Sequence, residues 1–93
     1  MNKWQERYKE LIGGKVPSRG RERDEFNLLS GMKENVIVEF PDFNGANGFK
    51  PAHTEEYIIT MNDCNMPEGV ISVEILASNL YLWNSRGYKI SSK

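Results

Sequence analysis

The apolar residues of this chain change their spacing near residue 34, and this change limits the folds that the chain can adopt. Before it, Trp4, Tyr8, Leu11 and Ile12 follow one another at intervals that place them on one face of a helix. After it, apolar and polar residues alternate, as they do in a strand with one buried face. We therefore expect an α+β fold in which helices precede strands.

A chain of 93 residues has the length of a single domain, here with a helical part over 1–33 and a β part over 34–92. In the helical part, the spacing predicts a helix over 2–12 that ends at two consecutive glycines. A second, short helix is predicted over 22–30, because acidic residues occupy its first turn, where the helix dipole favours them.

The β part contains five segments with the alternation that is typical of strands. They cover 35–40, 55–61, 70–76, 80–84 and 88–91. The last two segments are separated by Asn84-Ser85-Arg86-Gly87, a composition that indicates the turn of a hairpin. Short connections favour antiparallel pairing. We expect one or two N-terminal helices packed on an antiparallel sheet, or on a small open barrel, of about five strands.

A long connection over 41–54 separates the first two predicted strands, and a second connection covers 62–69. In the first connection, Phe43 and Phe49 bracket two Asn-Gly pairs, which favour tight reversals of the backbone. We expect both Phe side chains to pin this loop to the core. The alternative is that one Phe projects from the loop and contacts a partner.

The charged residues are distributed unevenly along the chain. Residues 1–33 hold eight basic and five acidic residues, residues 34–85 hold eight acidic residues and only Lys50, and residues 86–93 hold three basic residues. The total net charge of −1 therefore hides an acidic middle between two basic ends. Such a distribution bears on the choice of partner and on self-neutralisation, and it does not determine the fold.

Few residues of the chain are suited to catalysis or to metal binding. His53 is the only histidine and Cys64 the only cysteine, and neither has the sequence neighbours that a general base or a nucleophile needs. The carboxylates lack the spacing of a calcium loop, and no glycine-rich turn follows a strand and opens a helix. We expect no enzyme activity, no cofactor and no metal. A small oligomeric enzyme, or a subunit of one, is the third hypothesis.

A non-enzymatic protein-interaction module is the function that these features favour. Its partner would be another protein, such as a nucleic-acid enzyme, because an acidic and aromatic surface can occupy a basic site. Small inhibitors made by phages and other mobile elements have this general character, which is an analogy. The candidate partner-binding residues are Glu39, Asp42, Phe43, Phe49, Glu55, Glu56, Asp63, Glu68, Tyr81 and Trp83.

The alternative function is that of a nucleic-acid-binding domain. It would use the basic segment with Lys15, Arg19, Arg21 and Arg23, together with the aromatic residues of the later strands. The net charge of −1 and the isoelectric point near 5.8 disfavour this alternative. The same basic segment also suits a solvated loop that neutralises the chain's own acidic sheet.

The sequence favours a cytoplasmic location without membrane association. A single cysteine cannot form an internal disulfide, and the charged N-terminus is not followed by the apolar run of a signal peptide. No stretch approaches the ~20 apolar residues that span a bilayer. A homodimer would relieve the limit that so short a chain sets on the size of its core.

Overall fold

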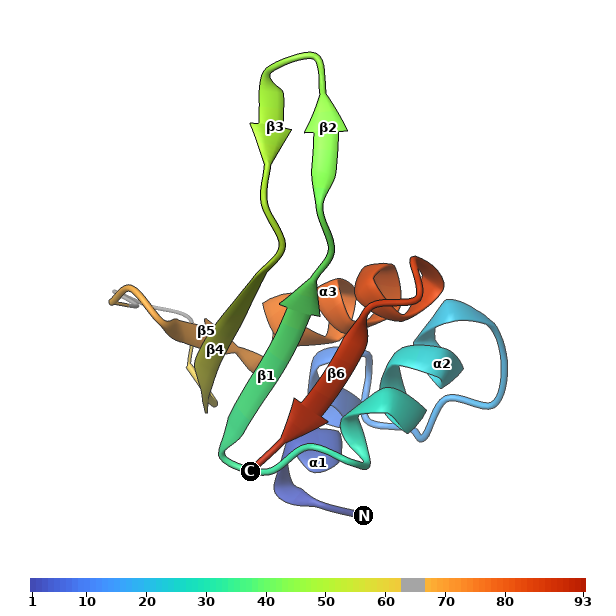
Figure 1. Ribbon diagram of the computed structural model, residues 1–93. Coiled ribbons are helices and arrows are strands. Elements are labelled where there is room, and N and C mark those ends of the chain that lie inside the picture. Colours follow the sequence, from blue (N-terminus) through green and yellow to red (C-terminus); the bar gives the residue numbers. More distant parts are fainter. Residues whose placement is uncertain (63–66) are drawn as a thin grey trace.

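Helices gather on one face of a four-stranded sheet, and a two-stranded arm projects from the end of that sheet (Figure 1). The computed structural model describes residues 1–62 and 67–93, and every element named below lies in these ranges. In chain order the elements are α1 (Lys3–Leu11), α2 (Gly20–Leu29), β1 (Asn35–Phe40), β2 (Phe43–Gly45), β3 (Gly48–Lys50), β4 (His53–Thr60), β5 (Val70–Ser72), α3 (Val73–Ser85) and β6 (Lys89–Ser92).

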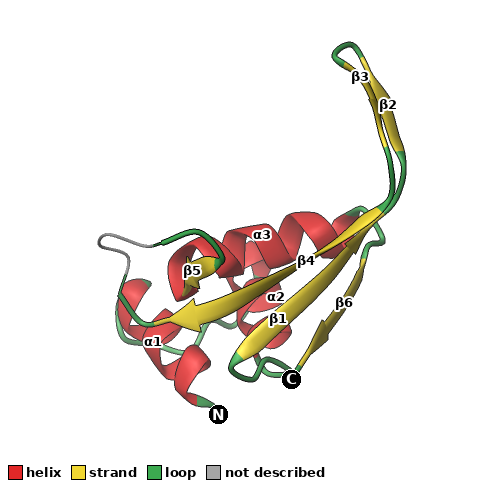
Figure 2. Ribbon diagram, turned by 60° about the vertical axis from the view of Figure 1, so that its left-hand side comes forward, coloured by secondary structure: helices red, strands yellow, loops and turns green. Residues whose placement is uncertain are grey.

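The α+β class is confirmed, but the sheet is mixed rather than antiparallel throughout, and it is an open sheet rather than the small open barrel that was the alternative. Its strand order is β5-β4-β1-β6, and β1 pairs antiparallel with both β4 and β6. The expectation of antiparallel pairing is wrong for β5, which runs parallel to β4. The direction of β5 follows from the element that comes after it. Strand β5 leads directly into α3, and α3 crosses the sheet to β6 on the opposite edge (Figure 2).

Helix α3 replaces the predicted strand over 80–84 and the second half of the predicted strand over 70–76. Ser72 begins the helix, because its side-chain oxygen accepts a hydrogen bond from the backbone N–H of Ile75. The buried residues of α3 then follow the helical repeat: Val73, Leu76, Ala77, Leu80 and Trp83. The predicted hairpin turn is instead the end of this helix, where Gly87 adopts a φ of 78° that favours glycine.

The remaining predicted elements are confirmed to within two residues. The predictions over 2–12, 22–30, 35–40, 55–61 and 88–91 correspond to α1, α2, β1, β4 and β6. The core lies between the sheet and the helices, with Leu29, Leu76 and Leu80 among its fully buried side chains. Trp4 and Tyr8 of α1 join it, as the spacing of the N-terminal helix predicts. Within the described ranges, no helix is long and apolar enough to cross a membrane.

The segment over 41–54, expected to be a loop pinned to the core, is a projecting arm made of β2 and β3 (Figure 2). Phe43 lies opposite Lys50, and Phe49 lies opposite Asn44, so the two Phe side chains point to opposite faces of the arm. Each Phe is 65% exposed. The expectation that they anchor the segment is therefore wrong. The arm is too far extended for its side chains to reach the core, because its two strands pair with each other and not with the four-stranded sheet.

Candidate functional site

A pocket of about 230 Å³ lies at the base of the arm, where the arm leaves the sheet. It is formed by the end of β1, both strands of the arm, the start of β4 and the segment that follows α3. Its lining combines aromatic rings with charged groups: Phe40, Pro41, Phe43, Lys50, His53, Glu55, Arg86 and Tyr88. The pocket thus unites residues from three separate stretches of the chain: 40–43, 50–55 and 86–88.

Aromatic rings pack around Phe40 on one side of this pocket. Phe40 and His53 are paired residues of β1 and β4, and their rings stack with centroids 4.9 Å apart. The ring of Tyr88 meets Phe40 edge-on at 5.4 Å, and the buried ring of Trp83 does so at 5.9 Å. Such contacts add stability beyond the burial of area, so Phe40 joins the pocket to the core.

Three polar side chains of β4 form a hydrogen-bonded row on the face of the strand that is turned toward the helices. His53, Glu55 and Tyr57 occupy alternate positions, so their side chains point the same way. His53 Nε2 lies 2.8 Å from Glu55 Oε2, and the Tyr57 hydroxyl donates to Glu55 Oε1. The hydrogen bonds from Tyr57 and His53 hold the pKa of Glu55 below its ordinary value, whereas burial and the Glu55 carboxylate raise the pKa of Tyr57 to about 12.

Both ring nitrogens of His53 face oxygen atoms of the protein. Nδ1 lies 3.2 Å from the carbonyl oxygen of Pro51, while Nε2 faces Glu55. Both of these neighbours are acceptors, and a neutral imidazole has a single N–H, so a neutral ring donates to only one of them. Among the residues that the structure describes, no three His, Cys, Asp or Glu side chains gather into a group that could hold a metal ion.

Two cations flank the pocket. Lys50 lies on the arm beside Phe43, and Arg86 caps the C-terminal end of α3. Both are exposed, and neither forms an ion pair within residues 1–62 and 67–93. The charge of Lys50 also helps to lower the pKa of Glu55, though less than the hydrogen bonds from Tyr57 and His53. The pocket therefore offers positive charge to solvent beside aromatic rings.

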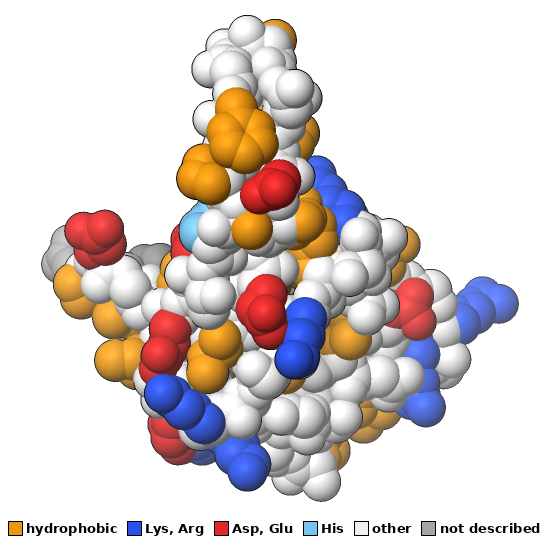
Figure 3. Space-filling view, viewed as in Figure 1, with side chains coloured by type: hydrophobic (Ala, Val, Ile, Leu, Met, Phe, Trp, Pro, Cys, Tyr) orange, Lys and Arg blue, Asp and Glu red, His pale blue; other side chains and the backbone are white. Residues whose placement is uncertain are grey.

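The acidic candidates on the sheet are partly neutralised by the chain itself. Three ion pairs join basic residues from the two ends of the chain to acidic residues of the middle: Lys3–Glu34 at 2.6 Å, Lys89–Glu39 at 3.5 Å and Lys93–Glu56 at 3.5 Å. On the sheet face in Figure 3, acidic and basic side chains accordingly lie next to each other, and apolar side chains stand out on the arm. The acidic middle forms no continuous anionic surface on this face.

The other predicted partner-binding residues are dispersed. Asp42 is held at the base of the arm, where its Oδ1 accepts a hydrogen bond from the backbone N–H of Ala52 at 2.6 Å. Trp83 is buried, and Tyr81 lies on α3 rather than on a strand. Glu68 is exposed, whereas Asp63 and Cys64 lie outside the described residues.

The basic segment predicted for nucleic-acid binding is largely engaged within the chain. Arg21 stacks on the ring of Tyr81 at 4.4 Å and pairs with Glu25 at 3.1 Å. Arg23 donates to the carbonyl oxygen of Pro17. Lys15 and Arg19 remain exposed. Since Arg21 pairs with its own helix, this segment does not neutralise the sheet as expected. Lys89 and Lys93, near the C-terminus, pair with Glu39 and Glu56 of the sheet instead.

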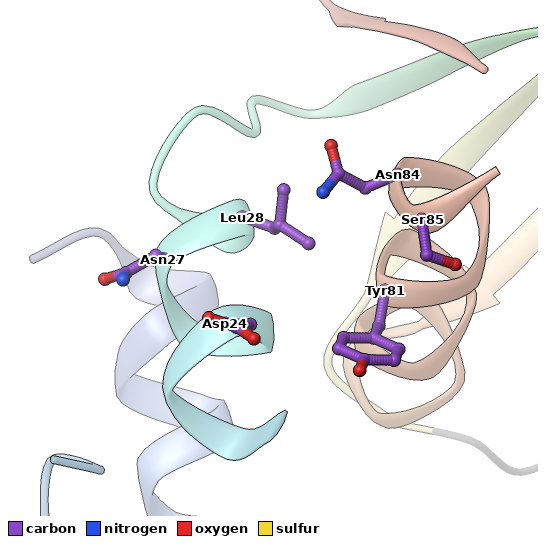
Figure 4. A pocket seen from close by; sticks show the side chains of 6 residues that line it. All are labelled: Asp24, Asn27, Leu28, Tyr81, Asn84 and Ser85. Atoms are coloured by element: carbon purple, nitrogen blue, oxygen red, sulfur yellow. The ribbon is translucent and has the colours of Figure 1, made fainter. Parts of the chain in front are cut away.

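A second, larger pocket of about 400 Å³ lies between α2 and α3 (Figure 4). Leu28 and Asn84 point toward one another across it, and its remaining lining is polar: Asp24, Asn27, Tyr81 and Ser85. Among the described residues, no cation lines this pocket, whereas two cations line the pocket at the base of the arm.

Sequence reasoning missed Lys50, Arg86, Phe40 and Tyr88 as parts of one site. The pairing of Phe40 with His53, and of Phe43 with Lys50, brings Phe40 and Lys50 together, and a hairpin register read from the Asn-Gly pairs is the signal that points to these two. Arg86 and Tyr88 reach the site because they follow α3. No family model, curated protein or solved structure matches the chain. The function must therefore be inferred from the arm and the pocket themselves.

Proposed function

We propose that this protein is a small, non-catalytic protein-interaction module that docks on its partner through the arm. The observation that carries the proposal is the exposure of Phe43 and Phe49, each 65% accessible on a hairpin that stands away from the body. Covering the exposed part of one such ring would contribute roughly 3 kcal/mol, since a Phe buries about 150–250 Å² at about 25 cal/mol per Å². Two such rings suit the anchors of an interface.

The construction of the arm supports the same proposal. A two-stranded hairpin without a third strand or a helix behind it is marginally stable in water. Here neither face of the hairpin rests on the sheet or on a helix, and each face carries one Phe. A partner that covers one or both faces would supply the packing that the arm lacks.

The charges of the arm favour a protein over a nucleic acid as the partner. A β-hairpin that enters a groove of DNA combines an apolar wedge with basic residues that neutralise phosphates. The segment over 41–52 holds one basic residue, Lys50, and one acidic residue, Asp42. Its net charge of zero gives no attraction to phosphate, so contact with an apolar protein surface is the better fit.

The test is capture of proteins from a nuclease-treated lysate of the native host on the immobilised protein and on Phe43→Ala, Phe49→Ala and the double variant. Ile58→Ala is the matched control, because Ile58 is 53% exposed on the sheet and not on the arm. We expect a captured protein whose yield falls at least about tenfold with the double variant and is unchanged with the control. All variants should melt like the parent, because exposed side chains contribute little to stability.

Two outcomes would contradict this proposal. Equal capture by the parent and by the double variant would show that docking does not use the arm. Capture that disappears on nuclease treatment would support nucleic-acid binding, for which exposed Lys15 and Arg19 would be the next residues to replace.

A further inference from the structure

The pocket at the base of the arm carries a small excess of positive charge. Lys50 and Arg86 line it together with the single carboxylate of Glu55, which leaves a net charge of +1 when His53 is neutral. Glu55 accepts hydrogen bonds from Tyr57 and His53, and among the described residues it forms no ion pair with Lys50 or Arg86. A group with one negative charge would balance the pocket, and the second charge of a phosphate dianion would face Glu55 without compensation.

The aromatic lining favours a flat apolar group next to this negative charge. Phe40 and Tyr88, whose rings meet edge-on, line the pocket together with the exposed ring of Phe43 from the arm. Rings of this kind pair with another ring by offset stacking or edge-on contact. Arg86 can form two parallel hydrogen bonds with a carboxylate. An acid that carries an aromatic ring would bring such a carboxylate to Arg86 while its ring contacts the aromatic lining.

The size of the pocket favours one group of a larger partner over a free ligand. Its volume of about 230 Å³ lies below the roughly 300–1,000 Å³ of pockets that enclose a drug-sized ligand. The exposed face of Phe43 also connects the pocket to the arm, which we have assigned to partner docking. A partner that lies along this face of the arm would place its next side chain or its chain terminus in the pocket.

We infer that the pocket at the base of the arm binds a carboxylate next to an aromatic ring, presented by the partner protein. In this arrangement, Arg86 and Lys50 hold the carboxylate, while Phe40, Phe43 and Tyr88 hold the ring. The assignment to a partner rests on the proposed function; the preference of the pocket for an aromatic carboxylate does not.

Titration of the ¹⁵N-labelled protein with N-acetylphenylalanine, followed by amide chemical shifts, tests the inference directly. N-acetylphenylalaninamide is the matched probe, because it has the same ring and nearly the same size without the charge. We expect saturable shifts confined to residues 40–55 and 86–88, with a dissociation constant in the millimolar range and at least about tenfold weaker binding of the amide.

Arg86→Gln and Lys50→Gln should each weaken binding of N-acetylphenylalanine severalfold, and the double variant about tenfold or more. Lys33→Gln is the control, because Lys33 is exposed and precedes β1, whereas the pocket lies at the other end of that strand. The dispersion of the amide spectrum reports whether each variant is folded.

Equal binding of the acid and the amide, or an equal loss with Lys33→Gln and Arg86→Gln, would overturn the carboxylate assignment. Micromolar binding of the free acid would overturn the assignment to a partner and indicate a small-molecule site instead. These outcomes are separate from failure of the proposed function, which is judged by capture with the Phe43 and Phe49 variants and needs no small-molecule probe.

Discussion

At the scale of single residues, Glu55 holds the polar row of β4 together. Its two carboxylate oxygens accept from His53 and from Tyr57, and its side chain is 38% exposed. Hydrogen bonds to a charged group stabilise a protein more than neutral ones, but partial exposure reduces their effect. We therefore expect Glu55→Gln to lower the free energy of unfolding by roughly 1 kcal/mol at pH 7.

The same carboxylate predicts a dependence of stability on pH. The pKa of Glu55 is lower in the folded protein than the ordinary value of 4.5, so the unfolded state takes up a proton first as the pH falls. The stability that Glu55 provides is thus present above pH 4.5 and is lost as the pH falls through the lowered value. Thermal unfolding between pH 7 and pH 3 should show a smaller acid loss for Glu55→Gln than for the parent.

Glu56→Gln is the control for this measurement, because Glu56 is the next residue of the strand and points to the opposite face. Glu56→Gln keeps the hydrogen bonds of Glu55, so it should still lose the stability that these bonds provide as the pH falls. If Glu55→Gln and the parent lose stability in parallel as the pH falls, the hydrogen bonds of Glu55 do not contribute to folding as the structure indicates.

At the scale of elements, the start of α3 depends on one side chain. Ser72 is 2% exposed, and its hydroxyl oxygen accepts from the N–H of Ile75 in the first turn. Ser72→Ala should lower the free energy of unfolding by about 1 kcal/mol, the usual loss on removing such a cap. Urea unfolding measures this change, with Ser18→Ala in an exposed loop as a control that should stay within about 0.5 kcal/mol of the parent. An equal effect of the two substitutions would rule out the cap.

Helix α3 is also the element that sequence reasoning missed, and the reason is physical. Ile71, Val73 and Ile75 alternate with less apolar residues, which indicates a strand, although Ile75 proves to be 43% exposed. The helical repeat becomes clear only when Leu80 and Trp83 are read together with Val73. The helices of the N-terminal part and strands β1 and β4 were predictable, because each has one unbroken period and a clear end.

The candidate site was less predictable than the fold. Phe43 and Phe49 were singled out from the sequence, but their exposure depends on the arm standing clear of the sheet. Arg86 reaches the pocket only because α3 crosses the whole sheet and ends beside the arm. Contacts of this kind are set by tertiary arrangement, and local periodicity carries no information about them.

Within the arm, Gly45 shapes the position of Phe43. A Cβ at residue 45 would overlap with the end of the Phe43 ring, so Gly45→Ala must displace that ring. Because the ring is exposed, it can move with little loss of stability, and the variant should melt like the parent. We expect its capture of the partner to fall severalfold. Gly31→Ala, where a Cβ meets nothing within 4 Å, should leave capture unchanged. If Gly45→Ala captures as much partner as the parent, docking does not require the position that the Phe43 ring has in this structure.

At the scale of the whole molecule, the arm and the body are separate in packing. No residue of the segment over 41–52 belongs to the buried core. Its ends are nevertheless close together, because Phe40 and His53 are directly paired residues of β1 and β4. The body therefore has the geometry of a hairpin that a two-residue turn could close.

Replacement of residues 41–52 by Asn-Gly should accordingly leave a folded body. The new turn suits the twist of the flanking strands, and the shorter connection lowers the entropy cost of closing β1 on β4. We expect cooperative thermal unfolding with a midpoint within about 4–8 °C of the parent, which corresponds to about 1 kcal/mol.

The same variant should lose capture of the partner and binding of N-acetylphenylalanine, since Phe43, Phe49 and Lys50 are removed. Loss of the cooperative transition would show that the body needs the arm to fold, and retained capture by a folded body would place the docking surface elsewhere.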